Sequence, residues 1–397
     1  MKKNSGEHMP HAITAVVFVV FIVLGLACAT RPSVGGSSEL YFDTCGGIGK
    51  IVATQYVKRG ESITIPGGEG LSLGGATFTG WYCIYSDGEV ATYNAGESFT
   101  PPGGYIDFYA KWELDADDLN SVTGLANKLV WLQNNAKSGN DYTIELSDNE
   151  SIGNHTLIYP GRNNITITLK GIDSNRIISS AINDRLFYVT TGVKLVLDKN
   201  ITLKGHINNK KELVYTWKNG ILQMNDGFTI TGNGGPGVLV HGTFEMNGGT
   251  ISGNKANFGG GVSVGAGGIF SMKGGIISGN NCSGVFIWND GTFVMSGGNI
   301  MDNTASEGGG VTVYYDGTFN MKGGTISGNK ATNGEGGGVI VMERGTFTMN
   351  QGIISRNTTN GIKRGGGIYL GNNTIFRRTG GTVSGNVPDD IYQLPSQ

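Results

Sequence analysis

Residues 242–254 read GTFEMNGGTISGN, and this phrase recurs through the second half of the chain. Successive copies start 23 to 29 residues apart, and self-similarity at such a period is typical of a solenoid. Apolar and polar residues alternate within each copy, which indicates strands rather than helices. The copies begin at Gly242, Gly268, Gly291, Gly317, Gly345 and, in degenerate form, Thr374, with looser copies at Gly192 and Gly220.

Each repeat offers three short strands with one apolar face, and stacking such repeats predicts an all-β parallel β-helix. Phe244 and Met246 would face inward on the first strand, Ile251 on the second and Val262 on the third. Eight to ten coils at ~4.8 Å per coil would span roughly 40–50 Å. The Asn that ends each copy is expected to stack into a hydrogen-bonded ladder, through Asn254, Asn280, Asn303, Asn329, Asn357 and Asn386.

Both ends of a solenoid need caps. Residues 117–136 carry apolar residues at helical spacing, so a helix is expected there as the N-terminal plug. Strands at 143–146, 165–169 and 193–197 would then start the solenoid. At the other end Arg378 replaces an inward Met, which suits a last coil whose core turns polar, and residues 387–397 would close it.

The composition excludes several classes of protein. Gly supplies 69 of 397 residues, but it does not fall at every third position and there are only 9 Pro, so the chain is not collagen. Hydrophobic residues reach 38%, which argues against disorder. A net charge of −2 gives no sign of a nucleic-acid partner. Four Cys are too few for a disulfide scaffold.

The N-terminus predicts export. Lys2 and Lys3 precede the uncharged, mostly apolar residues 12–27, a length that suits a signal peptide. The ending Gly25-Leu26-Ala27-Cys28 resembles a bacterial lipoprotein signal, although Gly25 stands where that family has Leu. The resemblance implies lipidation of Cys28 and an anchor in the outer membrane. Ordinary cleavage at 27–29 and an uncleaved anchor are the alternatives. We therefore assign residues 1–29 to the signal peptide and 30–39 to a tether.

Residues 40–113 form a separate unit of short aromatic strands and turns. It resembles one internalin-B-type repeat, also called the Listeria–Bacteroides repeat. The resemblance implies a small β-grasp-like module of bacterial surface proteins, a spacer or interaction unit without catalytic residues. It rests on Phe42-Asp43, Gly46-Gly47, Val57, Gly60-Glu61, residues 78–82 and residues 109–112.

Two cysteines depart from the pattern of that family. Cys45 replaces the usual Asn, and Cys83 follows the Trp-Tyr pair at 81–82. An exported protein permits a disulfide between them. The alternative is two separate buried thiols. Residues 114–142 then hold the capping helix and lead-in, and residues 143–397 the β-helix.

The paired phrases Ile-Ser-Gly-Asn and Gly-Gly-Gly-Val resemble those of right-handed β-helix surface proteins, including chlamydial polymorphic membrane proteins. Handedness comes from that resemblance, and the fold implies little about activity. Pectate lyases, polygalacturonases and phage depolymerases share the fold, so a polysaccharide lyase or hydrolase is the alternative function. The Asn-Thr-Asp, Gly-Asp-Asp and Gly-His-Gly phrases of polygalacturonases do not occur.

One set of charged residues falls in equivalent positions of neighbouring coils. Asp290 and Asp316 each precede a Gly-Thr-Phe phrase, and Arg344 takes that place in the next coil. Two such carboxylates beside an Arg could serve as acid and nucleophile in glycoside hydrolysis, or they could bind a cation. The simpler interpretation is that Asp-Gly forms a turn. His155, His206 and His241 lie in no motif and are expected at the surface, and no zinc-type spacing occurs.

The third strand offers a candidate binding patch. If Val311 and Val313 point inward, residues on either side point outward and align between coils. Exposed apolar patches mark binding surfaces, and aromatic rows suit sugar rings or a protein partner. A loop at 255–258 or 331–335, or the N-terminal module, could instead cover the patch, or β-propensity alone could explain it. The patch comprises Phe286, Trp288, Tyr314, Met342 and Tyr369.

These observations favour an exported, lipid-anchored protein that binds a glycan or a host or matrix protein without catalysis. No cofactor is expected, and the membrane is contacted through the lipid anchor. A purely structural role, as a surface stalk, is the third interpretation of the sequence.

Overall fold

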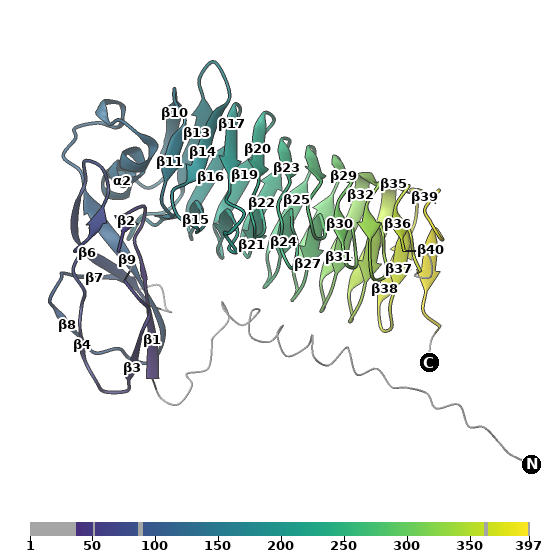
Figure 1. Cartoon of the computed structure of the whole chain (residues 1–397), viewed down its shortest axis with the longest axis horizontal. Helices are drawn as coiled ribbons and strands as arrows, with labels where there is room; N and C mark the ends of the chain where they lie inside the picture. Colours follow the sequence, from purple (N-terminus) through teal and green to yellow (C-terminus); the bar gives the residue numbers. More distant parts are fainter. Residues whose placement is uncertain (1–36, 51, 86–89, 361–363, 396–397) are drawn as a thin grey trace, which may run out of the picture.

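The computed structural model describes residues 37–50, 52–85, 90–360 and 364–395. They form a small β module and a long solenoid, joined by a short helix (Figure 1). The expected signal peptide, Cys28 and the first part of the expected tether lie outside these residues. Within the described part of the chain, no helix has the length and apolar character needed to cross a membrane.

The module is a mixed, β-grasp-like sheet in the order β3-β1-β9-β6-β7. β1 and β9 run parallel and the other pairs antiparallel. β1 begins at Ser37, so the strand takes in residues that the sequence assigned to the tether. In the core of the module, the rings of Phe42 and Phe108 stack with their centroids 4.9 Å apart. The Trp81 ring meets that of Phe42 edge-on, with 5.1 Å between centroids. The strands are β1 (Ser37–Asp43), β2 (Ile48–Gly49), β3 (Gln55–Lys58), β4 (Ile63–Thr64), β5 (Leu71–Ser72), β6 (Thr77–Ile84), β7 (Val90–Tyr93), β8 (Ser98–Phe99) and β9 (Gly104–Glu113).

The capping helix is shorter than the expected 117–136. A 3-10 turn, η2 (Leu119–Ser121), comes first, and α2 (Leu125–Asn135) follows. The backbone is extended at Val122, and Gly124 has φ 79°, so the helix cannot start earlier. Leu125, Leu129 and Leu132 are buried in the same core as the first coils. The helix therefore plugs the solenoid, as expected.

The rest of the chain is a right-handed parallel β-solenoid of about 10 turns. Each coil adds one strand to each of two adjoining faces of an 18-stranded sheet and one to a separate 10-stranded sheet, here the third sheet. The expected strands at 143–146, 165–169 and 193–197 are present as β10, β13 and β16.

The strand bounds follow the repeat. The first face holds β10 (Asp141–Leu146), β13 (Ile165–Gly171), β16 (Val193–Leu197), β19 (Ile221–Met224), β22 (Thr243–Met246), β25 (Ile269–Met272), β28 (Thr292–Met295), β32 (Thr318–Ser327), β35 (Thr346–Ser355) and β38 (Ile375–Arg378). The second holds β11 (Glu150–Ile152), β14 (Arg176–Ser180), β17 (Ile201–Lys204), β20 (Phe228–Thr231), β23 (Thr250–Ser252), β26 (Ile276–Ser278), β29 (Asn299–Met301), the ends of β32 and β35, and β39 (Thr382–Ser384).

The third strands of the coils form a separate sheet, and three short strands form a small fourth ladder. The third sheet holds β12 (His155–Leu157), β15 (Phe187–Val189), β18 (Val214–Thr216), β21 (Val238–Val240), β24 (Val262–Val264), β27 (Val285–Ile287), β31 (Val311–Val313), β34 (Val339–Val341), β37 (Ile368–Leu370) and β40 (Ile391–Gln393). The small ladder is β30 (Thr304–Ala305), β33 (Lys330–Ala331) and β36 (Thr358–Thr359).

Two columns hold the interior together. Phe rings of consecutive coils stack with centroids 4.7–4.9 Å apart, from Phe244 to Phe347. The expected Asn ladder is confirmed. The backbone N–H and Nδ2 of Asn254 both donate to Oδ1 of Asn280, at 3.0 and 3.1 Å, and the same pair of bonds recurs in each later coil.

The C-terminal end turns polar, as expected. Arg378 pairs with Met349 of the previous coil but is exposed, and its guanidinium donates to the carbonyls of Gly380 and Gly381 at 3.2 and 2.7 Å. The Asn ladder ends on Asp390, whose Oδ1 accepts two bonds from Asn386. β40 continues the third sheet by one more strand.

Candidate binding surface

The third sheet brings the predicted patch together as two columns. In the first, Phe286 pairs with Thr312, Thr312 with Ile340, and Ile340 with Tyr369. In the second, Trp288, Tyr314 and Met342 follow the strands directly. Their backbone N–H groups donate to the previous coil at 2.8–2.9 Å, so they are also stacked in register.

The first column is covered. Phe286 is only 9% exposed and Tyr369 7%. The Gly-Gly-Gly loops fold against it: a Cβ at Gly365 would lie 2.6 Å from the Cβ of Tyr369, and Gly365 has φ 67°. Phe258, in one of the loops suspected of covering the patch, packs its ring 5.7 Å from that of Phe286. The accessible part of the predicted patch is therefore the second column, whose side chains are half-buried.

This second column extends toward the module through residues that sequence reasoning missed. Trp217 follows β18 and His241 follows β21 as Trp288 follows β27, and the His241 N–H donates to Thr216 at 2.8 Å. Their position could have been predicted, because Trp217 and His241 each lie one residue past a strand of the third sheet. They were missed because the repeat is degenerate in these two coils. We call the whole column the outer row: Trp217, His241, Gly265, Trp288, Tyr314 and Met342.

His241 is the polar centre of the outer row and is 8% exposed, not at the surface as expected. Its Nδ1 and the Tyr215 hydroxyl share a hydrogen bond of 2.9 Å, and its ring contacts those of Trp217 and Trp288 at 6.0 and 6.1 Å. Nε2 is buried and has no hydrogen-bond partner among the described residues. Burial lowers the pKa of His241 to about 4, so the imidazole is neutral at pH 7.

Gly265 makes room for Trp288. Two coils separate Trp288 from His241, a distance of ~9.6 Å along the sheet, yet their rings touch because the indole leans over Gly265. A Cβ at Gly265 would lie 2.6 Å from Cε2 of Trp288. The indole N–H donates to the Ser263 hydroxyl at 3.3 Å, a long bond that holds the ring weakly.

The charged residues before the Gly-Thr-Phe phrases behave as turn residues. Asp290 has φ 63°, Asp316 61° and Arg344 65°, and the residue before each also has positive φ, as a type I′ turn requires. Arg344 holds Asp316 with two bonds, from Nε to Oδ1 at 2.9 Å and from an amino group to Oδ2 at 2.7 Å. These bonds lower the pKa of Asp316, the opposite of what a general acid needs.

Turn geometry predicts how Asp290 can be replaced. Asp290→Val should destabilise the protein by about 1 kcal/mol, because a β-branched residue is disfavoured at positive φ. Asp290→Gly should leave the stability unchanged or raise it slightly. Thermal unfolding of both variants and the wild type measures the two effects. Equal stability of the two variants would contradict the turn role.

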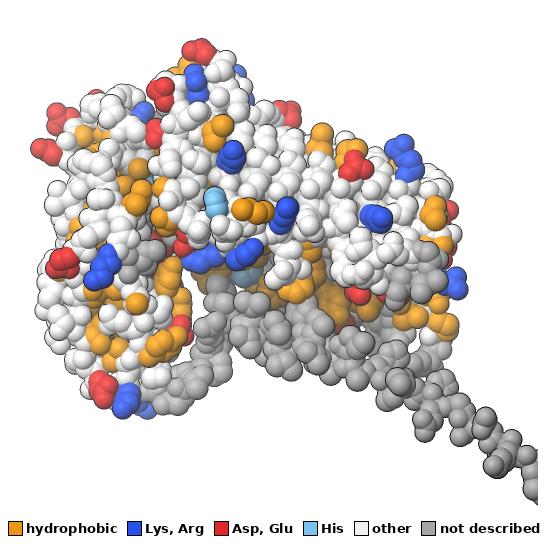
Figure 2. Space-filling model, in the orientation of Figure 1, with side chains coloured by type: hydrophobic (Ala, Val, Ile, Leu, Met, Phe, Trp, Pro, Cys, Tyr) orange, Lys and Arg blue, Asp and Glu red, His pale blue; other side chains and the backbone are white. Residues whose placement is uncertain are grey.

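A charged cluster lies where the module meets the solenoid, where Figure 2 shows basic side chains gathered. Lys211 pairs with Asp184 at 2.8 Å and reaches the Tyr41 hydroxyl of the module at 3.5 Å. Arg185 pairs with Glu212 at 3.0 Å and lies over the rings of two tyrosines of the third sheet. The contact between Lys211 and Tyr41 ties β1 to the solenoid, and the two ion pairs join its second and third coils.

The module docks on the first coil through a buried carboxylate. Asp43 accepts hydrogen bonds from Asn154 Nδ2 at 2.9 Å and from the Thr156 hydroxyl at 2.7 Å, and burial raises its pKa. His155 lies between them, is 3% exposed, and packs against the turn at Gly46. It is therefore a buried contact residue, not a surface one, whereas His206 is exposed as expected.

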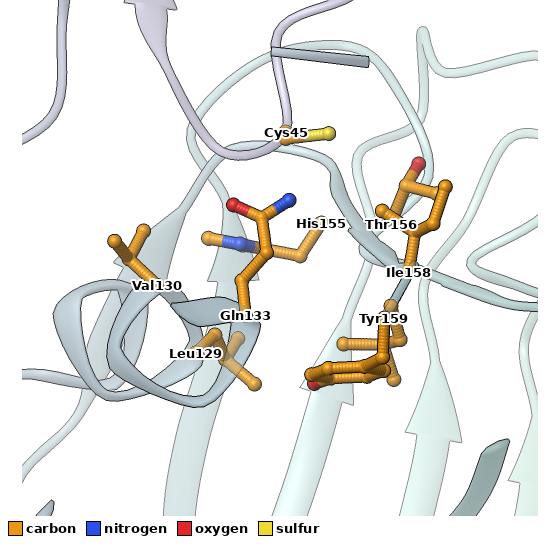
Figure 3. A pocket seen from close by; sticks show the side chains of 9 residues that line it. Cys45, Leu129, Val130, Gln133, His155, Thr156, Ile158 and Tyr159 are labelled. Carbon is orange, nitrogen blue, oxygen red and sulfur yellow. The ribbon is translucent and has the colours of Figure 1, made fainter. Parts of the chain in front are cut away.

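The same junction encloses a small cavity. It has a volume of about 10 Å³, close to what one water molecule needs. Figure 3 shows Gln133 on α2 and His155 on the solenoid strand facing the turn that carries Cys45. Burial raises the pKa of the Cys45 thiol and lowers that of His155 to about 3, so both groups are neutral and do not form an activated pair.

The expected Cys45–Cys83 disulfide is not formed, and both residues are buried free thiols. Cys83 is on β6 and Cys45 follows β1, and β9 lies between these two strands. Two strand spacings are ~9.6 Å, beyond the Cα separation that a disulfide can bridge. Burial raises the pKa of Cys83 to about 12.

Within the described ranges, no group of three or more His, Cys, Asp or Glu side chains could hold a metal ion. Comparison of the chain with protein-family models, with curated proteins and with solved structures gave no match.

Proposed function

We propose that this protein is an exported, lipid-anchored surface protein that binds its ligand on the third sheet of the solenoid without catalysis. The observation that carries the proposal is the outer row, in which the half-buried rings of Trp217, Trp288 and Tyr314 lie in one column of the stacked coils. Aromatic groups with an apolar body and a polar tip are the residues that binding surfaces favour.

The rest of the fold suits the role of a rigid support. The continuous Phe and Asn columns hold each coil in register with the next, so the outer row keeps its spacing. The hydrogen bonds of Lys211 with Tyr41 and of Asp43 with Asn154 and Thr156 fix the module against the first coils. We assign the module the role of a spacer between the anchor at Cys28 and the binding face, in line with its resemblance to internalin-B-type repeats.

A binding screen tests the proposal. The full chain, purified in a detergent without a sugar head group, is applied to an array of glycans and matrix proteins. A Trp288→Ala, Tyr314→Ala double variant should lose at least tenfold in affinity for whatever the wild type binds. Tyr56→Ala, which removes a 71% exposed aromatic ring from the module, is the matched control and should bind like the wild type.

Either of two results would count against the proposal. A folded wild type that binds nothing on the array would leave the solenoid as a stalk. Equal binding by the wild type and the double variant would place the binding site elsewhere on the molecule.

A further inference from the structure

Among the described residues of the outer row, His241 has a buried polar atom that the fold leaves without a hydrogen bond. Nε2 of His241 is buried and has no hydrogen-bond partner among the described residues, although Nδ1 is held by Tyr215. A buried polar atom without a partner costs about 1–3 kcal/mol, so its retention calls for a reason. Two indoles, Trp217 and Trp288, flank the imidazole that carries it.

We infer that His241, Trp217 and Trp288 form a subsite for a neutral sugar ring of a glycan, with Nε2 of His241 bonded to one ring hydroxyl. The inference rests on the proposed function and names its ligand. A hydroxyl suits Nε2 in either tautomer, since it can donate to a bare nitrogen or accept from a protonated one. The indole faces supply the apolar surface on which a sugar ring stacks.

The position of Trp288 explains how a ligand reaches a buried nitrogen. The indole lies over Gly265, is half-buried, and is held by one long bond of 3.3 Å. Because the indole and imidazole rings are in contact, displacement of Trp288 from above Gly265 would open a path to the imidazole and present the indole face to the incoming sugar. Binding therefore moves Trp288, which makes its fluorescence a direct readout.

Charge and shape favour a glycan over a protein partner. All six residues of the outer row are uncharged at pH 7, and the charged groups that act on Tyr314 are the carboxylates Glu343 and Glu307, so the row offers no cation to an acidic ligand. It is a single column of side chains, flanked at Tyr314 by the ring of Tyr315 at 4.7 Å, whereas a stable protein interface buries about 800 Å² on each side. From Trp217 to Tyr314 it spans four coil steps, roughly 19 Å, a regular track for a linear polymer.

The test uses the full chain and tri- to hexasaccharides of glucose, mannose, galactose, xylose and N-acetylglucosamine as probes. Titration calorimetry gives the affinity, and tryptophan fluorescence reports movement of the indole. His241→Phe keeps a buried aromatic ring but removes Nε2, and should weaken binding roughly tenfold. His241→Gln restores a polar group and should bind more tightly than His241→Phe. Trp288→Ala should abolish the fluorescence change and the binding, and Tyr56→Ala should alter neither.

The outcomes separate this inference from the proposed function. If His241→Phe binds as the wild type does while Trp288→Ala does not bind, the face is correct and the role of His241 is wrong. If no oligosaccharide binds but a matrix protein does, and Trp288→Ala abolishes that binding, the partner is a protein and the inference is wrong. If the folded wild type binds neither class, the proposed function fails as well.

Discussion

Asn329→Ala should lower the free energy of unfolding by about 4 kcal/mol, because it interrupts the Asn ladder at its centre. Asn329 is fully buried, and its Oδ1 accepts from the backbone N–H and the Nδ2 of Asn303 at 3.1 and 3.0 Å. Its Nδ2 donates to Asn357 Oδ1 at 3.0 Å and to the Ile300 carbonyl at 2.9 Å. The Asn303 N–H and the Ile300 carbonyl each lose this partner, at roughly 1–3 kcal/mol per buried group.

The measurement is denaturant unfolding followed by circular dichroism, with Asn320→Ala as the matched control. Asn320 is half-buried on the outward side of β32, so the same substitution there should cost much less. A loss of stability no larger than that of the control would show that the ladder contributes little, and that the Phe column holds the coils in register.

Asn329→Asp sharpens the test, because a carboxylate can accept hydrogen bonds but cannot donate one to Asn357. It also buries a charge, so at pH 7 it should be at least as unstable as Asn329→Ala and should recover as the pH falls. Asp390 shows where a carboxylate is tolerated. At the end of the ladder it accepts bonds from Asn386 at 3.0 and 2.9 Å and has no further Asn to which it must donate.

The ladder also shows why so much of the fold could be predicted from the sequence. The five coils that begin at Gly242, Gly268, Gly291, Gly317 and Gly345 repeat the same inward Phe, Met, Ile and Asn, so their strand positions, inner faces and stacking follow from one period. The limits of the capping helix did not follow, because they depend on the backbone at Val122 and Gly124 rather than on apolar spacing.

The binding face was harder to predict, since it depends on how loops lie over a strand. That Phe286 and Tyr369 fall in one column could be derived from the register, but their burial under the Gly-Gly-Gly loops could not. His241 was hidden for another reason. Nothing in the sequence shows that Trp288 leans across Gly265 to meet it.

Contacts between the two parts of the chain lay beyond the sequence altogether. No period links Asp43 to Asn154 and Thr156, which lie more than a hundred residues away. The disulfide expected between Cys45 and Cys83 failed for the same reason, because it required knowing that β9 separates β1 from β6. The same junction buries the imidazole of His155, which makes the fold sensitive to acid.

Acidification from pH 7 to pH 4 should cost about 3 kcal/mol of stability through His155 alone. Burial lowers the pKa of this imidazole to about 3 in the folded protein, against about 6.5 in the unfolded chain. Between these values the unfolded chain binds more protons, so the free energy of unfolding falls as the pH falls. At pH 4 the difference from the unfolded pKa is about 2.5 units, each worth about 1.36 kcal/mol.

Other buried titratable side chains also change the free energy of unfolding between pH 7 and pH 4, so the experiment compares the wild type with variants. Burial raises the pKa of Asp107 to about 6 and that of Asp43 above its usual range, and these carboxyls stabilise the fold as they take up protons. His241 acts in the same direction as His155. His155→Leu leaves all three in place, so the difference between wild type and variant isolates His155. His206→Leu, at an exposed position, is the control.

The expected result is that His155→Leu gains stability relative to the wild type as the pH falls from 6.5 to 4, while His206→Leu tracks the wild type. Protonation of His155 should also open the structure locally, because this imidazole packs against the module turn that carries Cys45. At pH 4 a thiol reagent that acts in acid should then label Cys45 in the wild type faster than in His155→Leu, with the labelled peptide identified by mass spectrometry. Parallel pH profiles for wild type and His155→Leu would mean that the imidazole is not desolvated by the docked module. The close packing at Gly46, on which the interface depends, would then be wrong.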